Sequence, residues 1–219
     1  MKLPTLVSRA LLSVALGVAL GVAPVTKANP ILIGNGYANG SEEFSVTAPT
    51  TTANAGAFTG TWNGQPIIFF CFELTQFFYF GVPYSDYVAS NPSNAQFALL
   101  SRLFTEAFAH VLDSTDNSAA FQLAVWEILY DPSPTSLSTG TFHVTNDFGH
   151  PGTVAAATNL LNNLPAVGTY SITWLHSPYE QDFIFGTNTL REAPEPSLLF
   201  LASIGLAAMG FVMRRRARQ

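Results

Sequence analysis

Two apolar runs, one at each end of the chain, limit what the sequence can fold into. The first run covers residues 10–25, follows Lys2 and Arg9, and leads into the small-residue site Thr26-Lys27-Ala28. A basic segment, a short apolar run and a small-residue site in this order are typical of a secretory signal peptide. We therefore expect residues 1–28 to be a signal peptide cleaved after Ala28. An uncleaved membrane anchor is the alternative.

The second apolar run covers residues 197–213 and lies between two distinctive flanks. Pro194-Glu195-Pro196 precedes it, and a basic end with Arg214, Arg215, Arg216 and Arg218 follows it. As a helix, this run would extend about 25 Å, which is barely enough to cross a bilayer. Arginines next to a span favour the cytoplasmic side. The pattern predicts a transmembrane helix over residues 197–213 whose C-terminus stays in the cytoplasm.

The order of these C-terminal features resembles the PEP-CTERM sorting signal over residues 194–219. That signal combines a Pro-Glu-Pro motif, here Pro194, Glu195 and Pro196, with a short hydrophobic helix and an Arg-rich tip. The resemblance implies recognition by an exosortase, a membrane protease, with cleavage near the motif. It also implies membrane insertion before processing and delivery to the cell surface or exopolysaccharide matrix of a Gram-negative bacterium, in a biofilm setting.

Residues 29–193 remain for a folded part, and about 165 residues are enough for one domain with its own core. This region holds 13 Asp and Glu against Arg102 and Arg191, a net charge of −11. Such a charge repels phosphate backbones, so nucleic acid is excluded as a partner. We expect a single extracellular domain over residues 29–193.

Local patterns predict an α+β domain with a mostly antiparallel β-sheet or barrel and two or three helices. Helices are expected from a capping box at Ser93 and Gln96, from an N-cap at Asn117 to a stop at Asp131-Pro132, and over residues 154–164. Trp62, Trp126 and Trp174 are expected to be largely buried. Strands are expected at residues 44–47, 57–62, 66–74, near 142, from 169 and from 182.

Cys71 is the single cysteine, so no internal disulfide can form in an exported domain. It lies in the apolar run IIFFCFEL, where alternation places Ile67, Phe69, Cys71 and Glu73 on one face. In the predicted helix, Gln122 shares an apolar face with Trp126. A buried amide without a partner costs about 1–3 kcal/mol, so Gln122 needs either a hydrogen bond or a chemical change.

These two segments resemble the thioester domains of bacterial surface adhesins. In that family, a strand cysteine followed by an acid is joined to the glutamine of a helical Thr-Gln-x-Ala-(Ile/Val)-Trp motif. The matching residues are Cys71 and Glu73 in FCFE, and Gln122, Ala124, Val125 and Trp126 in FQLAVW, with Phe121 in place of the threonine. The resemblance implies a Cys71-Gln122 thioester in a pocket formed by Phe70, Phe72, Glu73, Ala124 and Trp126.

A thioester is an acyl electrophile that amines open readily, so the implied function is covalent capture of an amine-bearing surface or exopolysaccharide. Such an adhesion module turns over once and is not an enzyme. The absence of lysine from residues 29–193 fits this reading, because no internal amine could open the bond.

Three other interpretations start from the same residues. A structural matrix protein would use Cys71 and Gln122 as ordinary core residues. A Cys-His hydrolase would pair Cys71 with His110, His143, His150 or His176, although no local signature supports it. His143, Asp147 and His150 have metal-like spacing, but their Gly/Pro-containing loop is better read as a solvated loop. We expect neither a metal nor a cofactor.

Overall fold

The computed structural model describes residues 30–131 and 133–190. The predicted signal peptide, the sorting motif and the transmembrane helix lie outside these residues. Within them, no helix is long and apolar enough to cross a membrane. The elements follow the order β1 (Ile31–Tyr37), β2 (Glu42–Thr47), β3 (Thr50–Ala55), β4 (Phe58–Trp62), β5 (Gln65–Cys71), β6 (Pro83–Tyr84), β7 (Val88–Ser90), α1 (Ala95–Ala107), a 3-10 turn η1 (Phe108–His110), α2 (Thr115–Tyr130), β8 (Val144–Asn146), α3 (Pro151–Asn162), β9 (Tyr170–His176) and β10 (Phe183–Asn188).

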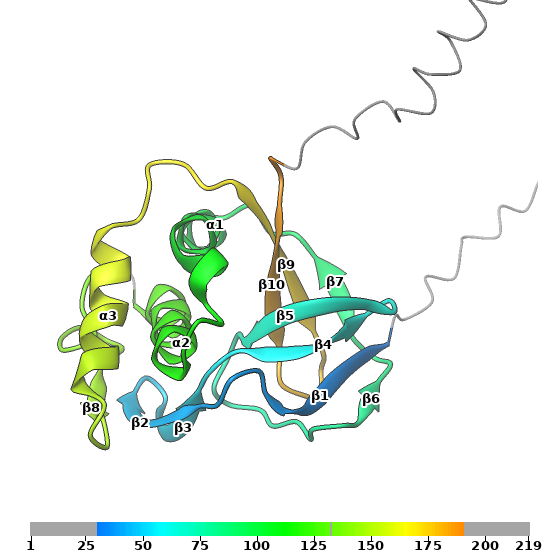
Figure 1. Ribbon diagram of the computed structural model, residues 1–219, viewed down its shortest axis with the longest axis horizontal. Helices are drawn as coiled ribbons and strands as arrows, with labels where there is room; N and C mark the ends of the chain where they lie inside the picture. Colours follow the sequence, from blue (N-terminus) through cyan, green and yellow to red (C-terminus); the bar gives the residue numbers. More distant parts are fainter. Residues whose placement is uncertain (1–29, 132, 191–219) are drawn as a thin grey trace, which may run out of the picture.

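Seven strands form a curled antiparallel sheet, shaped like half of a barrel, in the order β6-β1-β4-β5-β10-β9-β7 (Figure 1). The hairpin between β4 and β5 turns on two residues, Asn63 and Gly64, which have φ angles of 54° and 74°. Positive φ at both turn positions is what a type I′ hairpin requires, and Asn-Gly is the pair that adopts it most easily. This turn fixes the register of β5, the strand that ends at Cys71.

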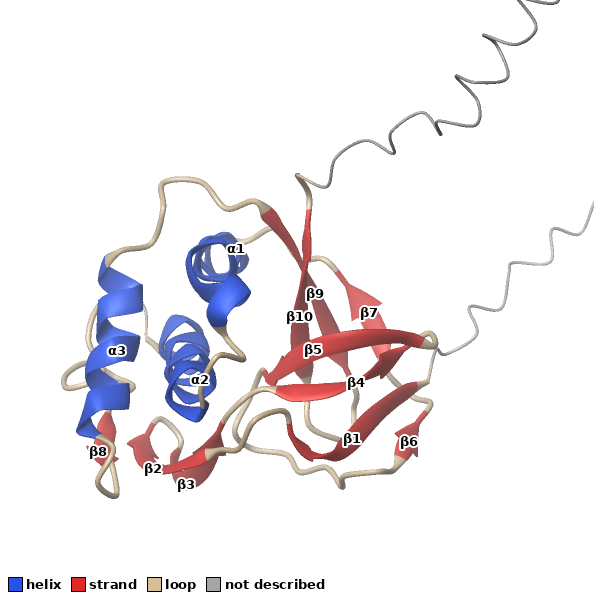
Figure 2. Ribbon diagram, in the orientation of Figure 1, coloured by secondary structure: helices blue, strands red, loops and turns tan. Residues whose placement is uncertain are grey.

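A second, three-stranded antiparallel sheet has the order β3-β2-β8. The helices lie together on one side of the large sheet, and the small sheet lies below α2 and α3 (Figure 2). Helix α2 contacts α1, α3, β2 and β3. It is buried at every position from Ser118 to Ile128, including the polar residues Ser118, Gln122 and Glu127.

The core consists of two clusters that meet at β5. Phe69 and Cys71 face the cluster that includes Trp126 and Phe183, whereas Phe70 faces the cluster that includes Phe121. The predicted alternation along β5 is therefore confirmed and extends to Phe72, which packs against the second cluster. It fails at Leu74, beyond the end of β5, which packs against the first cluster rather than the second.

The α+β class with antiparallel sheets and three helices is confirmed. Both predicted N-caps are wrong. Helix α1 is capped by Asn94, whose Oδ1 accepts from Phe97 N at 3.1 Å, and α2 is capped by Ser114, whose hydroxyl accepts from Asn117 N at 3.0 Å. Trp62 and Trp126 are buried as expected, but Trp174 is only partly buried.

Candidate functional site

The structure places the side chain of Gln122 against the backbone of Cys71. Cys71 N donates to Gln122 Oε1 at 2.9 Å, and Gln122 Nε2 donates to Cys71 O at 3.0 Å. Gln122 is completely buried, and Cys71 is 8% exposed. The two residues that sequence reasoning paired, 51 positions apart, are thus in direct contact.

Local structure explains this contact. Cys71 is the last residue of β5 and pairs with Phe183 of β10, which leaves its own N–H and C=O free on the side that faces α2. Gln122 lies in the middle of α2. Its neighbours along the helix pack into both core clusters. A primary amide has one acceptor and two donors. The Gln122 side chain can therefore pair with both the N–H and the C=O of Cys71, which no neighbouring strand pairs on this side.

Burial raises the pKa of the Cys71 thiol well above its usual range, and the nearby carboxylate of Glu73 adds to the effect. Both causes disfavour the thiolate. The free side chain would therefore be a neutral thiol at physiological pH, protected from the redox chemistry that needs an exposed thiolate.

A cavity of about 220 Å³ opens beside Cys71. Trp126 lines it and is 1% exposed, yet its indole Nε1 has no hydrogen-bond partner. An unpaired buried N–H is costly, so the Trp126 indole lacks a hydrogen bond that such a group normally makes. The full lining is Tyr37, Thr51, Thr52, Ala53, Asn54, Cys71, Glu73, Leu74, Gln76, Phe77, Phe78, Trp126 and Gln181.

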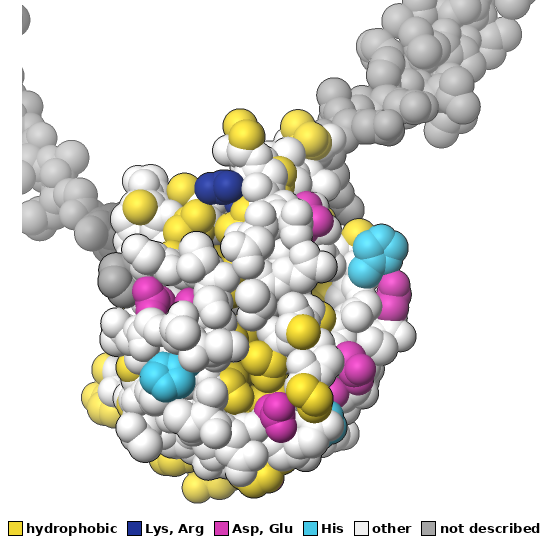
Figure 3. All heavy atoms as spheres, turned by 90° about the vertical axis from the view of Figure 1, so that its left-hand side faces the viewer, with side chains coloured by type: hydrophobic (Ala, Val, Ile, Leu, Met, Phe, Trp, Pro, Cys, Tyr) yellow, Lys and Arg dark blue, Asp and Glu magenta, His cyan; other side chains and the backbone are white. Residues whose placement is uncertain are grey.

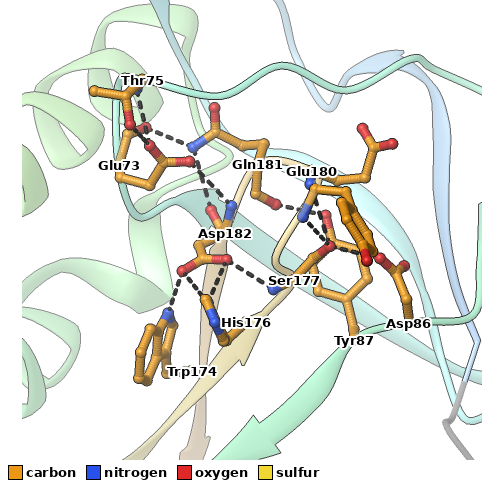
Figure 4. Close-up of polar contacts among 11 residues, drawn as sticks. Glu73, Thr75, Asp86, Tyr87, Trp174, His176, Ser177, Glu180, Gln181 and Asp182 are labelled. Atoms are coloured by element: carbon orange, nitrogen blue, oxygen red, sulfur yellow. Dashed lines mark hydrogen bonds and ion pairs between the residues drawn. The ribbon is translucent and has the colours of Figure 1, made fainter.

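A polar network builds one wall of this cavity (Figure 4). The Glu73 carboxylate accepts from Thr75 N at 2.8 Å and from the amide of Asp182 at 3.4 Å. Gln181 donates through its side chain to the Glu73 carbonyl and through its backbone to Phe77 O. These hydrogen bonds connect the segment after β5 to the turn between β9 and β10.

The same network continues around the buried carboxylate of Asp182. That carboxylate accepts from Trp174 Nε1 at 3.0 Å and from Ser177 N at 2.9 Å, and it pairs with His176 Nδ1 at 2.9 Å (Figure 4). Asp182 therefore holds the end of β9 and the following turn in place.

Only some of the residues expected around the thioester lie at the cavity. Glu73 and Trp126 lie with Cys71 at the cavity. Phe70, Phe72 and Ala124 lie in the second core cluster and do not line it. Phe70 packs on Phe121 with ring centroids 4.5 Å apart, and Phe72 packs on Trp174 at 5.3 Å.

No histidine lines the cavity at Cys71. His110 and His176 pair with Asp113 and Asp182, and His150 pairs with Glu42 at 3.3 Å. His143 contacts Thr47 and the Gly140 carbonyl. Among residues 30–131 and 133–190, no group of three His, Cys, Asp or Glu is placed to hold a metal ion.

Sequence reasoning missed three parts of the site: Tyr37, the strand β3, and Gln181. Tyr37 lies beside Cys71, and burial, with a smaller contribution from the thiol, raises the pKa of its hydroxyl. The run TTTANA of β3 lacks large apolar residues, so its pattern carries no strand signal of its own. Only the pairing of β3 with β2 makes it a strand.

No protein family model, no curated protein and no solved structure matches this chain.

Proposed function

We propose that this chain is an exported surface or matrix protein that captures amines covalently through a thioester between Cys71 and Gln122. The observation that carries the proposal is the pair of hydrogen bonds that holds the Gln122 amide against Cys71, at 2.9 and 3.0 Å. The adjacent cavity, with a buried and unpaired Trp126 N–H, supports it further.

Formation of the bond joins Cys71 Sγ to Gln122 Cδ and breaks the Cδ–Nε2 bond. The thiol proton leaves with the nitrogen, so ammonia is the second product. Charge develops on Oε1 during the attack, and Cys71 N already donates to this oxygen. Donors aimed at such an oxyanion stabilise acyl-transfer transition states, and removing one from a protease oxyanion hole costs about 2.7–4 kcal/mol.

Capture is the reverse type of step with a different amine. The amine nitrogen attacks Gln122 Cδ, the C–S bond breaks, and Cys71 takes up the proton that the nitrogen loses. The raised pKa of the buried Cys71 thiol favours this neutral product. Burial also keeps water from the thioester until a partner occupies the cavity.

Methylamine labelling tests the proposal. The full-length chain should gain one methylamide at Gln122 and release one free thiol, both detected by peptide mass spectrometry and thiol titration. Cys71→Ala and Gln122→Ala should gain neither, because the electrophile needs both residues. Gln96→Ala is the control for loss of a glutamine outside the site, because Gln96 is exposed on α1 and does not line the cavity, and it should retain the label at Gln122. Wild-type chain that takes up no label would contradict the proposal.

A structural matrix protein without a reactive bond is the second candidate. The same hydrogen bonds favour it, because they satisfy the unreacted Gln122 amide with the Cys71 N–H and C=O. In that case Gln122 is a core amide that closes the end of β5, and the labelling experiment gives no adduct.

Export and sorting form the other half of the proposal. They rest on the sequence of residues 1–28 and on the Pro194-Glu195-Pro196 motif with its apolar run and Arg-rich tip. In a host with an exosortase, the recovered chain should begin near Asn29 and end near Pro194, as read by terminal peptide mass spectrometry. Changing Pro194, Glu195 and Pro196 to alanine should retain the C-terminal segment, and a full-length cytoplasmic chain in the wild type would contradict the proposal.

A further inference from the structure

The cavity beside Cys71 runs along the edge of strand β3. It touches four consecutive residues, from Thr51 to Asn54. Successive side chains of a strand point to opposite faces, so a cavity that meets four in a row follows the edge of the strand rather than one face. Strand β3 is the outer strand of its sheet, in the order β3-β2-β8.

The hydrogen bonds of β2 show which backbone N–H and C=O groups of β3 point away from β2. The Ser45 carbonyl accepts from Thr145 Oγ1 at 3.2 Å, and Thr47 N donates to His143 O at 3.2 Å, so these residues of β2 point toward β8. In an antiparallel pair, facing residues either both point their N–H and C=O groups at each other or both point them away. Because Ser45 points toward β8, its partner Thr52 directs its own N–H and C=O away from β2. Asn54 points the same way, because its carbonyl accepts from Tyr37 at 3.3 Å.

An exposed aromatic ring in the cavity lining supplies apolar contact. Phe77 lines the cavity and is 83% exposed. An exposed ring at a cavity mouth can pack on the methylene stem of a lysine, and its face attracts the ammonium group.

Charge favours a basic partner. Residues 30–131 and 133–190 carry twelve Asp and Glu side chains, and Arg102 is their single Lys or Arg. Arg102 is occupied by the carbonyls of Leu164 and Pro165. Acidic side chains are spread over the face shown in Figure 3. Such a surface attracts cationic chains at long range and repels acidic ones.

We propose that the amine partner is a lysine in an extended polypeptide segment that adds to the free edge of β3. This inference rests on the thioester function proposed above and names its substrate class. The peptide backbone pairs with the Thr52 N–H and C=O, as in strand addition to an exposed sheet edge. Its lysine then enters the cavity and reaches Gln122 Cδ past Cys71, because Cys71 lines the cavity and Gln122 does not. The ε-nitrogen bonds to Cδ, the C–S bond breaks, and Cys71 leaves as the thiol with the proton that the nitrogen loses.

The experiment compares three amines on the full-length chain at equal concentration: methylamine, a glucosamine oligomer, and a capped Thr-Val-Lys-Val-Thr peptide. A second peptide carries N-methyl groups on both valines and cannot pair with a strand edge. Protein variants are Thr52→Pro, which removes the outward N–H while an edge strand tolerates proline, and Thr52→Ala, which keeps it. The readout is the rate of adduct formation at Gln122.

The unmodified peptide should react at least about tenfold faster than methylamine, because pairing positions its amine at the acyl carbon. This advantage, taken as the ratio of the peptide rate to the methylamine rate on the same chain, should disappear with the N-methylated peptide and with Thr52→Pro, and persist with Thr52→Ala. A peptide with no advantage, an N-methylated peptide that keeps it, or a faster glucosamine oligomer would overturn the proposal.

A binding measurement separates this inference from the thioester itself. In the Cys71→Ala chain no bond can form, yet the labelled peptide should still bind by fluorescence anisotropy and lose its affinity on N-methylation. If methylamine does not label the wild type, the thioester proposal is contradicted. The peptide-binding measurement can still test strand addition to β3 in that case. Absence of peptide binding here would overturn the strand-addition proposal on its own.

Discussion

Buried polar side chains on α2 serve different purposes, and Glu127 shows the contrast with Gln122. Gln122 is completely buried and has both of its amide atoms paired with Cys71. Glu127 is 1% exposed and its Oε2 has no partner. Burial, with the neighbouring Asp131 carboxylate as a smaller cause, raises the pKa of Glu127 to about 8. The Gln122 amide thus has hydrogen-bond partners for its oxygen and its nitrogen, whereas burial favours the neutral, protonated form of Glu127.

Glu127 therefore makes stability depend on pH. Its carboxyl loses a proton near the ordinary pKa of 4.5 in the unfolded chain and near 8 in the folded chain. Between these values the folded state binds more protons, so the free energy of unfolding should fall as pH rises from about 4.5 to 8, at up to about 1.4 kcal/mol per pH unit. Urea unfolding at pH 5, 6, 7 and 8 measures this slope.

Glu127→Gln should flatten that dependence and raise stability at pH 8. Glu106→Gln is the control, because Glu106 is exposed on α1 and should leave the slope unchanged. A wild-type chain whose stability is constant over this range would show that Glu127 is not the group described here.

At the scale of elements, the turn between β9 and β10 fixes the wall of the cavity through Asp182. Asp182→Ala would leave the N–H groups of Trp174 and Ser177 without their acceptor. Loss of hydrogen bonds to a buried carboxylate should lower the free energy of unfolding by about 2–4 kcal/mol. Denaturant unfolding at constant pH measures it.

The matched control is Asp113→Ala. Asp113 also pairs with a histidine, His110 at 2.8 Å, but both side chains are more than half exposed. An exposed pair of this kind contributes about 0–1 kcal/mol. Equal effects of the two substitutions would mean that the Asp182 network does not hold the turn.

Elements with strong apolar patterns could be predicted from the sequence, and those defined by pairing could not. β5, β9, β10 and the body of α2 carry dense apolar or aromatic runs, and each was expected at its place. Strands β1, β6 and β7 were not predicted because they are short or rich in glycine. Strand β3 was not predicted because it is polar. The caps were misplaced because Ser93 and Asn94, like Ser114 and Asn117, are both good N-cap residues, and the packing of each helix decides between them.

The candidate site divides in the same way. Cys71 and Gln122 were paired through the resemblance of FCFE and FQLAVW to the two motifs of thioester domains, and an amide on an apolar face called for an explanation of its own. Glu73 was expected on the strand, but it lies beyond β5 and binds Thr75 and Asp182. Phe70 and Phe72 were expected around the thiol, but alternation turns them to the other face of the sheet. Residues from β3 and the β9–β10 turn arrive through long-range contacts that no local pattern encodes.

For the whole molecule, the proposed function combines export and sorting, expected from the two ends of the sequence, with one contact inside the folded part. The curled sheet brings the end of β5 against α2, and the small sheet supplies an open edge beside the same contact (Figure 1). If the proposed thioester forms, the absence of lysine from residues 29–193 leaves its acyl carbon to amines from outside the chain. The proposed function thus depends on whether Cys71 and Gln122 are bonded.

Intact mass of freshly prepared, never-reduced protein tests that bond most directly. Closure of the thioester expels ammonia, so the chain should weigh about 17 Da less than its processed sequence, and Cys71 should not titrate as a free thiol after unfolding in acid. Cys71→Ala and Gln122→Ala should each match their sequence mass. A wild-type mass equal to the sequence mass, together with one titratable thiol, would contradict the thioester and leave Gln122 as a core amide at the end of β5.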